Sequence, residues 1–133
     1  MGILMTVFGY KGTVTESVQK FKDEGVPKVE KYVKELLNGK DFAGGSTPDI
    51  VDINIITLLE RLVMIEGTAM NDLFEFLDLK KNAPTIYAYV HRFRALPQVQ
   101  GHVLNHEYYK KYIPAWLKLE AGQRQPLLVA FVK

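Results

Sequence analysis

Apolar residues recur at helical spacing along most of this chain. Between residues 29 and 37 they stand at i, i+4, i+7 and i+8, which places them on one stripe of a helix that ends at Leu37. Pro27 falls inside this pattern, and proline lacks the amide that a helix interior requires. We therefore expect Pro27 either to kink the helix or to mark its true beginning.

A second segment is apolar on nearly every side. Nine of the thirteen residues from Ile53 to Ile65 are Ile, Leu, Val or Met. Such a segment is typical of a central helix that its neighbours cover on most sides. Gly67 is expected to end it.

Two aspartates stand at the start of this helix, in the stretch "FAGGSTPDIVDINII". Asp49 is in the position of an N-cap and Asp52 follows three residues later, so each carboxylate can accept from the other residue's backbone N–H in a capping box. Both charges also face the positive end of the helix dipole. The alternative is a pair of carboxylates for acid–base chemistry or a metal, which is less favoured because the backbone would occupy both side chains.

Further patterns predict shorter helices near residues 70–79, 84–96, 98–105 and 107–120. Only the final "LLVAFVK" has the composition of a strand. Five or six helices in one domain predict an all-α fold, an orthogonal helical bundle. We expect a single domain over residues 1–133, in which residues 1–10 are the end of a truncated first helix and residues 121–133 form a tail.

The composition narrows the chemistry that the chain can perform. Its 133 residues are 47% hydrophobic and 24% charged, as in ordinary globular domains. Cysteine is absent, which excludes disulfides, thiolate metal sites and a cysteine nucleophile. Residues 1–79 hold 8 Lys and Arg against 13 Asp and Glu, and residues 80–133 hold 9 against 2, but the net charge of +2 is too small to indicate a nucleic-acid or membrane partner. No apolar run approaches the roughly 20 residues of a membrane span.

Two smaller patterns have ordinary explanations. His102 and His106 stand at i, i+4, but a metal site needs a third ligand and the motif H-E-x-x-H is missing, so we expect no metal. Lys110 and Lys111 lie among tyrosines, a mixture that a binder of single-stranded nucleic acid could use. A terminal amphipathic helix explains them as well, and we expect no nucleic-acid partner.

The order and spacing of the segments resemble a known family. "FAGGSTPDIVDINII" resembles the segment that opens the central helix in the C-terminal domain of cytosolic glutathione transferases, and "NAPTIYAYVHRFRALPQVQGHVLNHEYY" resembles a later stretch of that domain, closest to the mu and sigma classes. "MGILMTVFGY" looks like the end of the long helix that begins the domain. The resemblance covers about residues 1–120 and departs at Ala83, where the family usually has Phe.

This resemblance implies a site that is only partly present. The family's catalytic tyrosine or serine and its glutathione-binding residues lie in an N-terminal thioredoxin-like domain, to which nothing in this sequence corresponds. We therefore expect no catalytic residue and no cofactor in this chain, with glutathione as co-substrate if the whole enzyme is formed. By position, Phe8, Tyr10 and Tyr108 would contact the electrophile, although core packing accounts for these residue types as well.

Two functions follow from the resemblance. In the first, the chain is the helical domain of a glutathione transferase, a fragment or truncated form, which forms the wall of the electrophile pocket and is inactive alone. In the second, it is a non-catalytic interaction module within a larger assembly, because a face without its covering domain needs another partner. In both, a thioredoxin-like domain or another protein chain is expected against residues 1–10, and a homodimer is a further alternative. We expect a cytoplasmic protein or, alternatively, a subunit of a larger complex in an organelle.

Overall fold

The domain is built from helices. The computed structural model describes residues 14–100 and 106–118. In chain order its elements are α2 (Glu16–Lys20), η1 (Phe21–Gly25), α3 (Val26–Leu37), α4 (Ile50–Val63), α5 (Asn71–Leu77), α6 (Leu79–Asn82), α7 (Pro84–Arg94), α8 (Pro97–Gln100) and α9 (His106–Leu117). Within these ranges, β structure is limited to one isolated bridge between Phe42 and Gly45. The predicted all-α bundle is confirmed, while the expected end segments, 1–10 and 121–133, lie outside the described residues.

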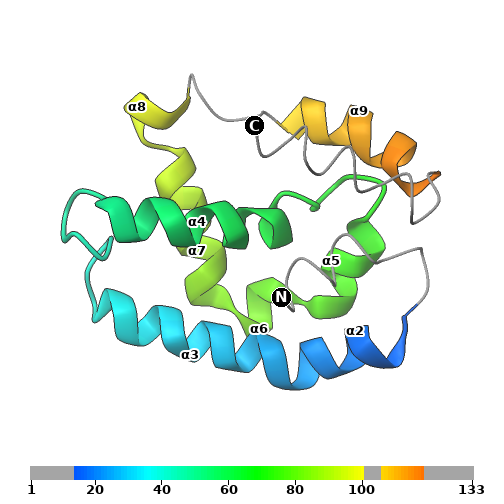
Figure 1. Ribbon diagram of the computed structural model, residues 1–133, viewed down its shortest axis with the longest axis horizontal. Helices are drawn as coiled ribbons and strands as arrows, with labels where there is room; N and C mark the ends of the chain where they lie inside the picture. The colour runs from blue at the N-terminus through cyan, green and yellow to red at the C-terminus, as the bar shows by residue number, and fades with distance from the viewer. Residues whose placement is uncertain (1–13, 101–105, 119–133) are drawn as a thin grey trace.

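The first three elements run on as one helix, which Figure 1 draws as an unbroken ribbon from α2 to α3. In η1 the turn is wider, and the Val26 N–H bonds to the carbonyl of Phe21, five residues back. Pro27 follows at once, and a wider turn accommodates the proline because its ring would clash with the carbonyl four residues back in a regular helix. Gly25 suits this turn, since a Cβ there would lie 2.5 Å from the Phe21 ring. The helix therefore does not begin at Pro27.

Helix α7 occupies the centre of the bundle. It packs against α3, α4 and α6, and Figure 1 shows it crossing behind α4 at a steep angle. One face of α7 is buried and carries Ile86, Tyr89, Val90 and Phe93. The same hydrophobic core contains Val26, Val33 and Leu37 of α3 and Ile56, Leu59, Leu62 and Val63 of α4.

Helix α4 is not the covered central helix that its composition predicts. Its inner face is buried, but Ile50 is 67% exposed, Ile53 48%, Leu58 45% and Val51 38%. The prediction was wrong because apolar composition reports what a segment prefers, whereas the cover must be supplied by other parts of the protein. One side of α4 therefore presents large apolar side chains at the surface.

The shorter helices differ from their predicted bounds. Asp78 adopts a left-handed conformation, with φ of 48°, and separates α5 from α6 within the segment predicted as one helix over 70–79. Helix α8 is a single turn over Pro97–Gln100, and residues 101–105 of the helix predicted there lie outside the described residues. In the described part of the chain, no helix combines the length and the apolar character needed to cross a bilayer.

Candidate functional site

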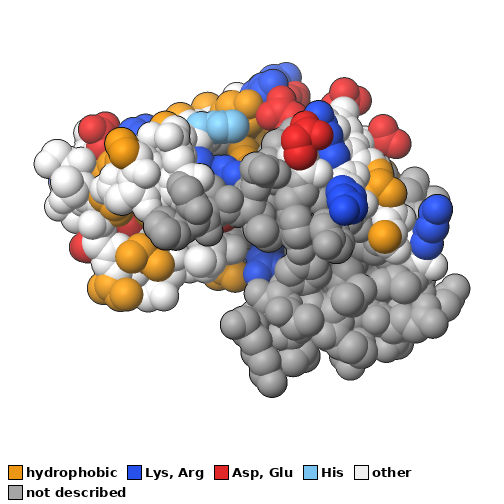
Figure 2. Space-filling view, turned by 90° about the horizontal axis from the view of Figure 1, so that it is seen from above, with side chains coloured by type: hydrophobic (Ala, Val, Ile, Leu, Met, Phe, Trp, Pro, Cys, Tyr) orange, Lys and Arg blue, Asp and Glu red, His pale blue; other side chains and the backbone are white. Residues whose placement is uncertain are grey.

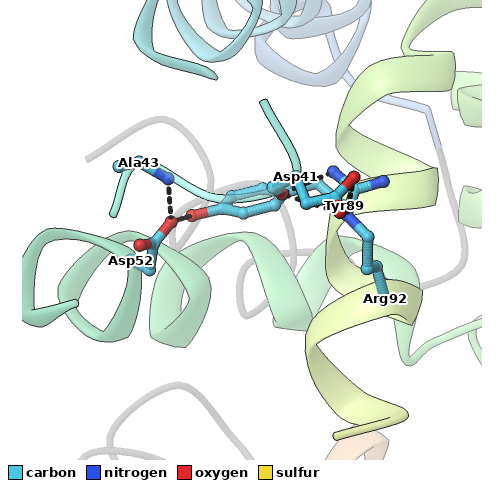
Figure 3. A network of polar contacts seen from close by, with 5 residues as sticks. All are labelled: Asp41, Ala43, Asp52, Tyr89 and Arg92. Carbon is cyan, nitrogen blue, oxygen red and sulfur yellow. Dashed lines mark hydrogen bonds and ion pairs between the residues drawn. The ribbon is translucent and has the colours of Figure 1, made fainter. Parts of the chain in front are cut away.

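Four hydrogen-bond donors converge on the carboxylate of Asp52, in the first turn of α4. Its side chain is fully buried, and its Oδ1 accepts from the Ala43 N–H at 2.8 Å and from the Tyr89 hydroxyl at 2.5 Å (Figure 3). Its Oδ2 accepts from the N–H groups of Gly44 at 3.2 Å and Asp49 at 2.9 Å. One carboxylate thus joins the loop before α4, the start of α4 and the centre of α7.

Asp49 makes the reciprocal contacts at the same helix start. Its Oδ1 accepts from the N–H groups of Val51 at 2.9 Å and Asp52 at 3.3 Å. Together the two aspartates form a complete capping box. The loop is tight at Gly44, where a Cβ would lie 2.5 Å from the carbonyl oxygen of Thr47. The carboxylates are thus engaged by the backbone.

Arg92 holds the same loop from the next turn of α7. Its Nε and Nη2 donate to the carbonyl of Asp41 at 3.0 and 2.7 Å, and its guanidinium lies 5.7 Å from the centre of the Phe42 ring. Figure 3 shows Arg92 and Tyr89 reaching the loop side by side from one helix. We refer to Asp52, Tyr89, Arg92 and loop residues 41–44 as the Asp52 cluster.

The electrostatics of the cluster favour an ionised Asp52. Burial alone would raise the pKa of this carboxyl, but the bonds from Tyr89 and from the backbone N–H groups outweigh burial and hold its pKa below the ordinary value. Burial and the neighbouring carboxylate raise the pKa of Tyr89. A residue that takes up a proton near neutral pH needs a pKa close to that pH, so Tyr89 is unsuited to act as a base.

Sequence reasoning missed a second buried carboxylate, that of Glu30 on α3. The Glu30 side chain accepts from the N–H groups of Thr85 at 2.9 Å and Ile86 at 3.0 Å, in the first turn of α7. The residue at the N-cap of α7, Ala83, has no side chain that could do this. The only signal in the sequence was the missing cap itself, because no local pattern reveals a partner 55 residues away.

A third polar group lies at the surface around Glu66. Its carboxylate contacts the Lys80 ammonium at 2.6 Å and accepts from the Tyr87 hydroxyl at 2.9 Å, and the His91 ring lies 4.5 Å from that of Tyr87. Burial, followed by the bond to Glu66, raises the pKa of Tyr87, and burial lowers the pKa of His91. A cavity of about 380 Å³ adjoins Glu66 and Lys80, with Phe74 in its wall. Because its pKa is raised, Tyr87, like Tyr89, is not poised as a tyrosinate.

The structure does not describe the side chains that are predicted to contact an electrophile. Phe8 and Tyr10 lie outside the described residues, and Tyr108 lies in α9 but its side chain is not among those described. Within the described ranges, no three His, Cys, Asp or Glu side chains are grouped to hold a metal ion. The structure therefore brings Asp49 and Asp52 together and leaves the proposed pocket residues untested.

Comparisons with known proteins agree with this helical arrangement. Residues 2–106 match the family described as glutathione S-transferase, C-terminal domain. The matched range contains α2 to α8 and the whole Asp52 cluster. Comparisons with curated proteins and with solved structures yield no significant match.

Proposed function

The chain belongs to the glutathione S-transferase C-terminal domain family, and from this premise we propose that it serves as the helical domain of a glutathione transferase. In this role it forms a wall of the electrophile pocket, with Phe8, Tyr10 and Tyr108 as contact residues. A thioredoxin-like domain packed against residues 1–10 would bind glutathione and supply the group that activates its thiol. The chain alone would then have no transferase activity.

The extent of the family match carries this proposal. It begins at residue 2 and so includes the segment that holds Phe8 and Tyr10, while Tyr108 follows two residues after its end. The match therefore supports treating the first ten residues as part of the helical domain rather than as an unrelated extension.

The chemistry of the described side chains gives independent support. The buried carboxylates of Asp52 and Glu30 are bonded to backbone N–H groups at helix starts. The pKa values of Tyr87 and Tyr89 are shifted upward, away from neutral pH. These groups are those of a scaffold that positions a pocket wall. They are less suited to a catalytic centre that abstracts a proton from a thiol.

Reconstitution tests the proposal. The chain would be joined after the thioredoxin-like domain of a mu-class enzyme, and glutathione conjugation to a chloronitrobenzene would be measured for the fusion and for the chain alone. We expect turnover only from the fusion. Turnover by the chain alone would contradict the assignment of the activating group to the other domain.

Variants of the fusion test the pocket residues. Phe8→Ala, Tyr10→Ala and Tyr108→Ala should raise the KM for the electrophile and leave the KM for glutathione nearly unchanged. The matched control is Val14→Ala, an exposed apolar residue just beyond the proposed wall segment. Unchanged electrophile kinetics in all three variants would remove the pocket-wall role.

The exposed apolar side of α4 favours a second candidate, a non-catalytic interaction module in a larger assembly. Large exposed apolar groups close together mark interaction surfaces. Native mass spectrometry of the assembly isolated from its source cells separates the two candidates, since it shows whether a thioredoxin-like domain is covalently joined to this chain.

We place the assembly in the cytoplasm, with an organellar complex as the alternative. Fractionation of the source cells tests this location.

A further inference from the structure

The outer side of α4 carries large apolar side chains at the surface. We define the α4 face as Ile50, Val51, Ile53, Asn54, Thr57 and Leu58, all of which are exposed. These positions lie on one side of a helix, opposite the buried Asp52, Ile56 and Leu59. In Figure 2, hydrophobic side chains reach the surface at the left end of the molecule, the end at which α4 begins in Figure 1. Exposed apolar groups gathered in this way mark a surface that another segment or molecule covers.

Covering the α4 face with apolar groups would cost little desolvation. None of its six residues is ionisable. The Thr57 hydroxyl already donates to the Asn54 carbonyl at 2.8 Å, and the Asn54 amide is the only other polar side chain of the face. Because a polar group is costly to bury only when it loses its hydrogen bonds, the occupant that fits this face is uncharged and apolar.

The same chain contains a segment of that chemistry near its C-terminal end. Residues 126–132, with the sequence PLLVAFV, are seven consecutive apolar residues and the longest such run in the chain. Its nearest charged neighbours are Arg124 and Lys133, so no charge interrupts it. A run of this kind promotes association when water surrounds it, and a docking site within its own chain prevents this.

We propose that the α4 face is the docking site of the chain's own C-terminal apolar segment, residues 126–132. The inference goes beyond both candidate functions and rests on neither. It gives the outer side of α4 an occupant within the chain, and a partner that uses this side of α4 must first displace that occupant.

The length of chain after α9 is sufficient for this contact. The description of the chain ends at Lys118, just after α9, and Ile113 of α9 packs against the hydrophobic core. The eleven residues from Lys118 to Val129 span up to about 36 Å when extended. This is more than twice the radius of gyration of about 14 Å expected for a domain of this length. The segment therefore reaches α4 from an anchored starting point.

The dimensions of the segment match those of the α4 face. Residues 126–132 have the composition of a strand, in which Leu127, Val129 and Phe131 share one side. The outer two of these residues lie about 13 Å apart in an extended strand. Ile50 and Leu58, at the two ends of the α4 face, lie about 12 Å apart along the helix axis. Three large apolar side chains thus span the length of the face.

The covalent connection favours this occupant over a free molecule of the same chemistry. A tethered segment acts at an effective concentration in the millimolar range. Its docking therefore requires only a weak intrinsic affinity, and the burial of a few apolar side chains supplies that.

Disulfide trapping in the full chain gives the sharpest test, because the chain has no cysteine of its own. Asn54→Cys and Val129→Cys place one thiol at the middle of the face and one at the middle of the segment, so they meet whichever way the segment runs. Under mild oxidation at low protein concentration, the double variant should form a disulfide within one chain. The product is a monomer whose mass has fallen by two hydrogen atoms.

Tyr32→Cys with Val129→Cys is the matched control, since Tyr32 is 54% exposed on α3. The Asn54–Val129 pair should close roughly tenfold faster than this control, because docking raises the local concentration of the second thiol. Equal rates for the two pairs would overturn the proposal. A covalent dimer in place of the closed monomer would assign the face to another molecule and would overturn it as well.

A dye that fluoresces on apolar surfaces, such as anilinonaphthalene sulfonate, provides the second test. Leu127→Asp with Phe131→Asp should release the segment and raise the dye fluorescence of the full chain, and adding Leu58→Glu should remove most of that rise. The control, Gln123→Asp with Gln125→Asp, places the same charges just before the apolar run and should leave the fluorescence unchanged. Equal fluorescence of the two double variants, or a rise that Leu58→Glu does not reduce, would contradict docking on the α4 face.

Discussion

Two helices of this domain begin against a buried carboxylate, and the two carboxylates come from opposite places in the sequence. Asp52 belongs to the helix that it caps, three residues after the N-cap of α4. Glu30 belongs to α3 and caps α7, whose first turn lies 55 residues further along the chain. The comparison shows that a helix start can be satisfied by its own sequence or by a packed neighbour, with similar hydrogen-bond lengths.

The two carboxylates differ in how many parts of the fold they join. Asp52 binds three backbone N–H groups and the Tyr89 hydroxyl, and so connects the loop, α4 and α7. Glu30 binds two backbone N–H groups of one helix, with the Lys34 ammonium 3.8 Å away on its own helix. We therefore expect the loss of Asp52 to cost more than the loss of Glu30, although both side chains are buried.

Asp52→Ala should give the largest effect. It would leave several backbone donors and the Tyr89 hydroxyl without an acceptor in the interior, so we expect the free energy of unfolding to fall by about 4 kcal/mol. The melting temperature should fall by roughly 10 °C or more, or the cooperative transition should disappear. Circular dichroism on heating measures this. Asp49→Ala is the control and should cost about 1 kcal/mol, as an exposed cap does. A melting curve unchanged by Asp52→Ala would contradict the role of the cluster.

Glu30→Ala should have the next largest effect, about 2–3 kcal/mol, because two N–H groups at the start of α7 lose their acceptor. Hydrogen exchange distinguishes this change from the first one. Protection should fall most at the amides of Thr85 and Ile86, and the loop before α4 should stay protected. The matched control, Lys34→Ala, should change little, because its ammonium is exposed. Faster exchange spread evenly over the domain would contradict a local cap.

This contrast also shows how far the sequence could predict the fold. The all-α bundle and the pairing of Asp49 with Asp52 were accessible because helical periodicity and capping depend on residues within a few positions of each other. The cap from Glu30 was not accessible, since it arises only once α3 and α7 pack together. The sequence showed a proline at the start of α7 and no capping residue before it, but not which distant carboxylate would serve.

The contacts of the candidate sites also divide into local ones, which the sequence predicts, and long-range ones, which it does not. The bond from Tyr89 to Asp52 spans 37 residues and could not be read from the capping motif, although the motif itself could. The exposed side of α4 escaped prediction for a related reason. A sequence shows which positions are apolar, but whether they meet the core, another domain or a second copy depends on surfaces that the sequence pattern of one helix does not contain.

Tyr89→Phe removes one of the four donors to Asp52 and leaves the three backbone donors in place. We expect a loss of about 1–2 kcal/mol, because a hydrogen bond to a charged group is lost while the ring remains packed. In the Asp52→Ala background the same substitution should cost less, since its partner is already absent. Equal costs in both backgrounds would show that the hydroxyl does not act through Asp52.

The pH dependence of Tyr89→Phe follows from the same bond. The ordinary pKa of an aspartate is 3.8, and in the folded protein the pKa of Asp52 lies below this value. The unfolded chain therefore binds a proton at a pH where the folded chain does not. The stability that Asp52 contributes is therefore complete above the unfolded value and is lost as the pH falls below it, through the folded pKa. Tyr89→Phe should weaken this acid dependence, and Asp52→Asn should abolish the part that Asp52 provides. Urea unfolding over a pH series measures both.

Lys80→Ala should give the smallest effect and test whether burial, rather than ion pairing as such, separates these carboxylates from Glu66. The Lys80 ammonium lies 2.6 Å from the Glu66 carboxylate, and this distance is shorter than most of the contact distances of Asp52 and Glu30. However, the Lys80 side chain is 57% exposed and that of Glu66 is 31% exposed. Water and dissolved ions screen the attraction between the two charges of such a pair. When one partner is removed, water forms hydrogen bonds with the other. We therefore expect Lys80→Ala to change the melting temperature by no more than about 2 °C. At high salt the difference between Lys80→Ala and the unmodified chain should be no larger. A loss as large as that of Glu30→Ala would show that the surface pair also supports the packing of α6 against α7.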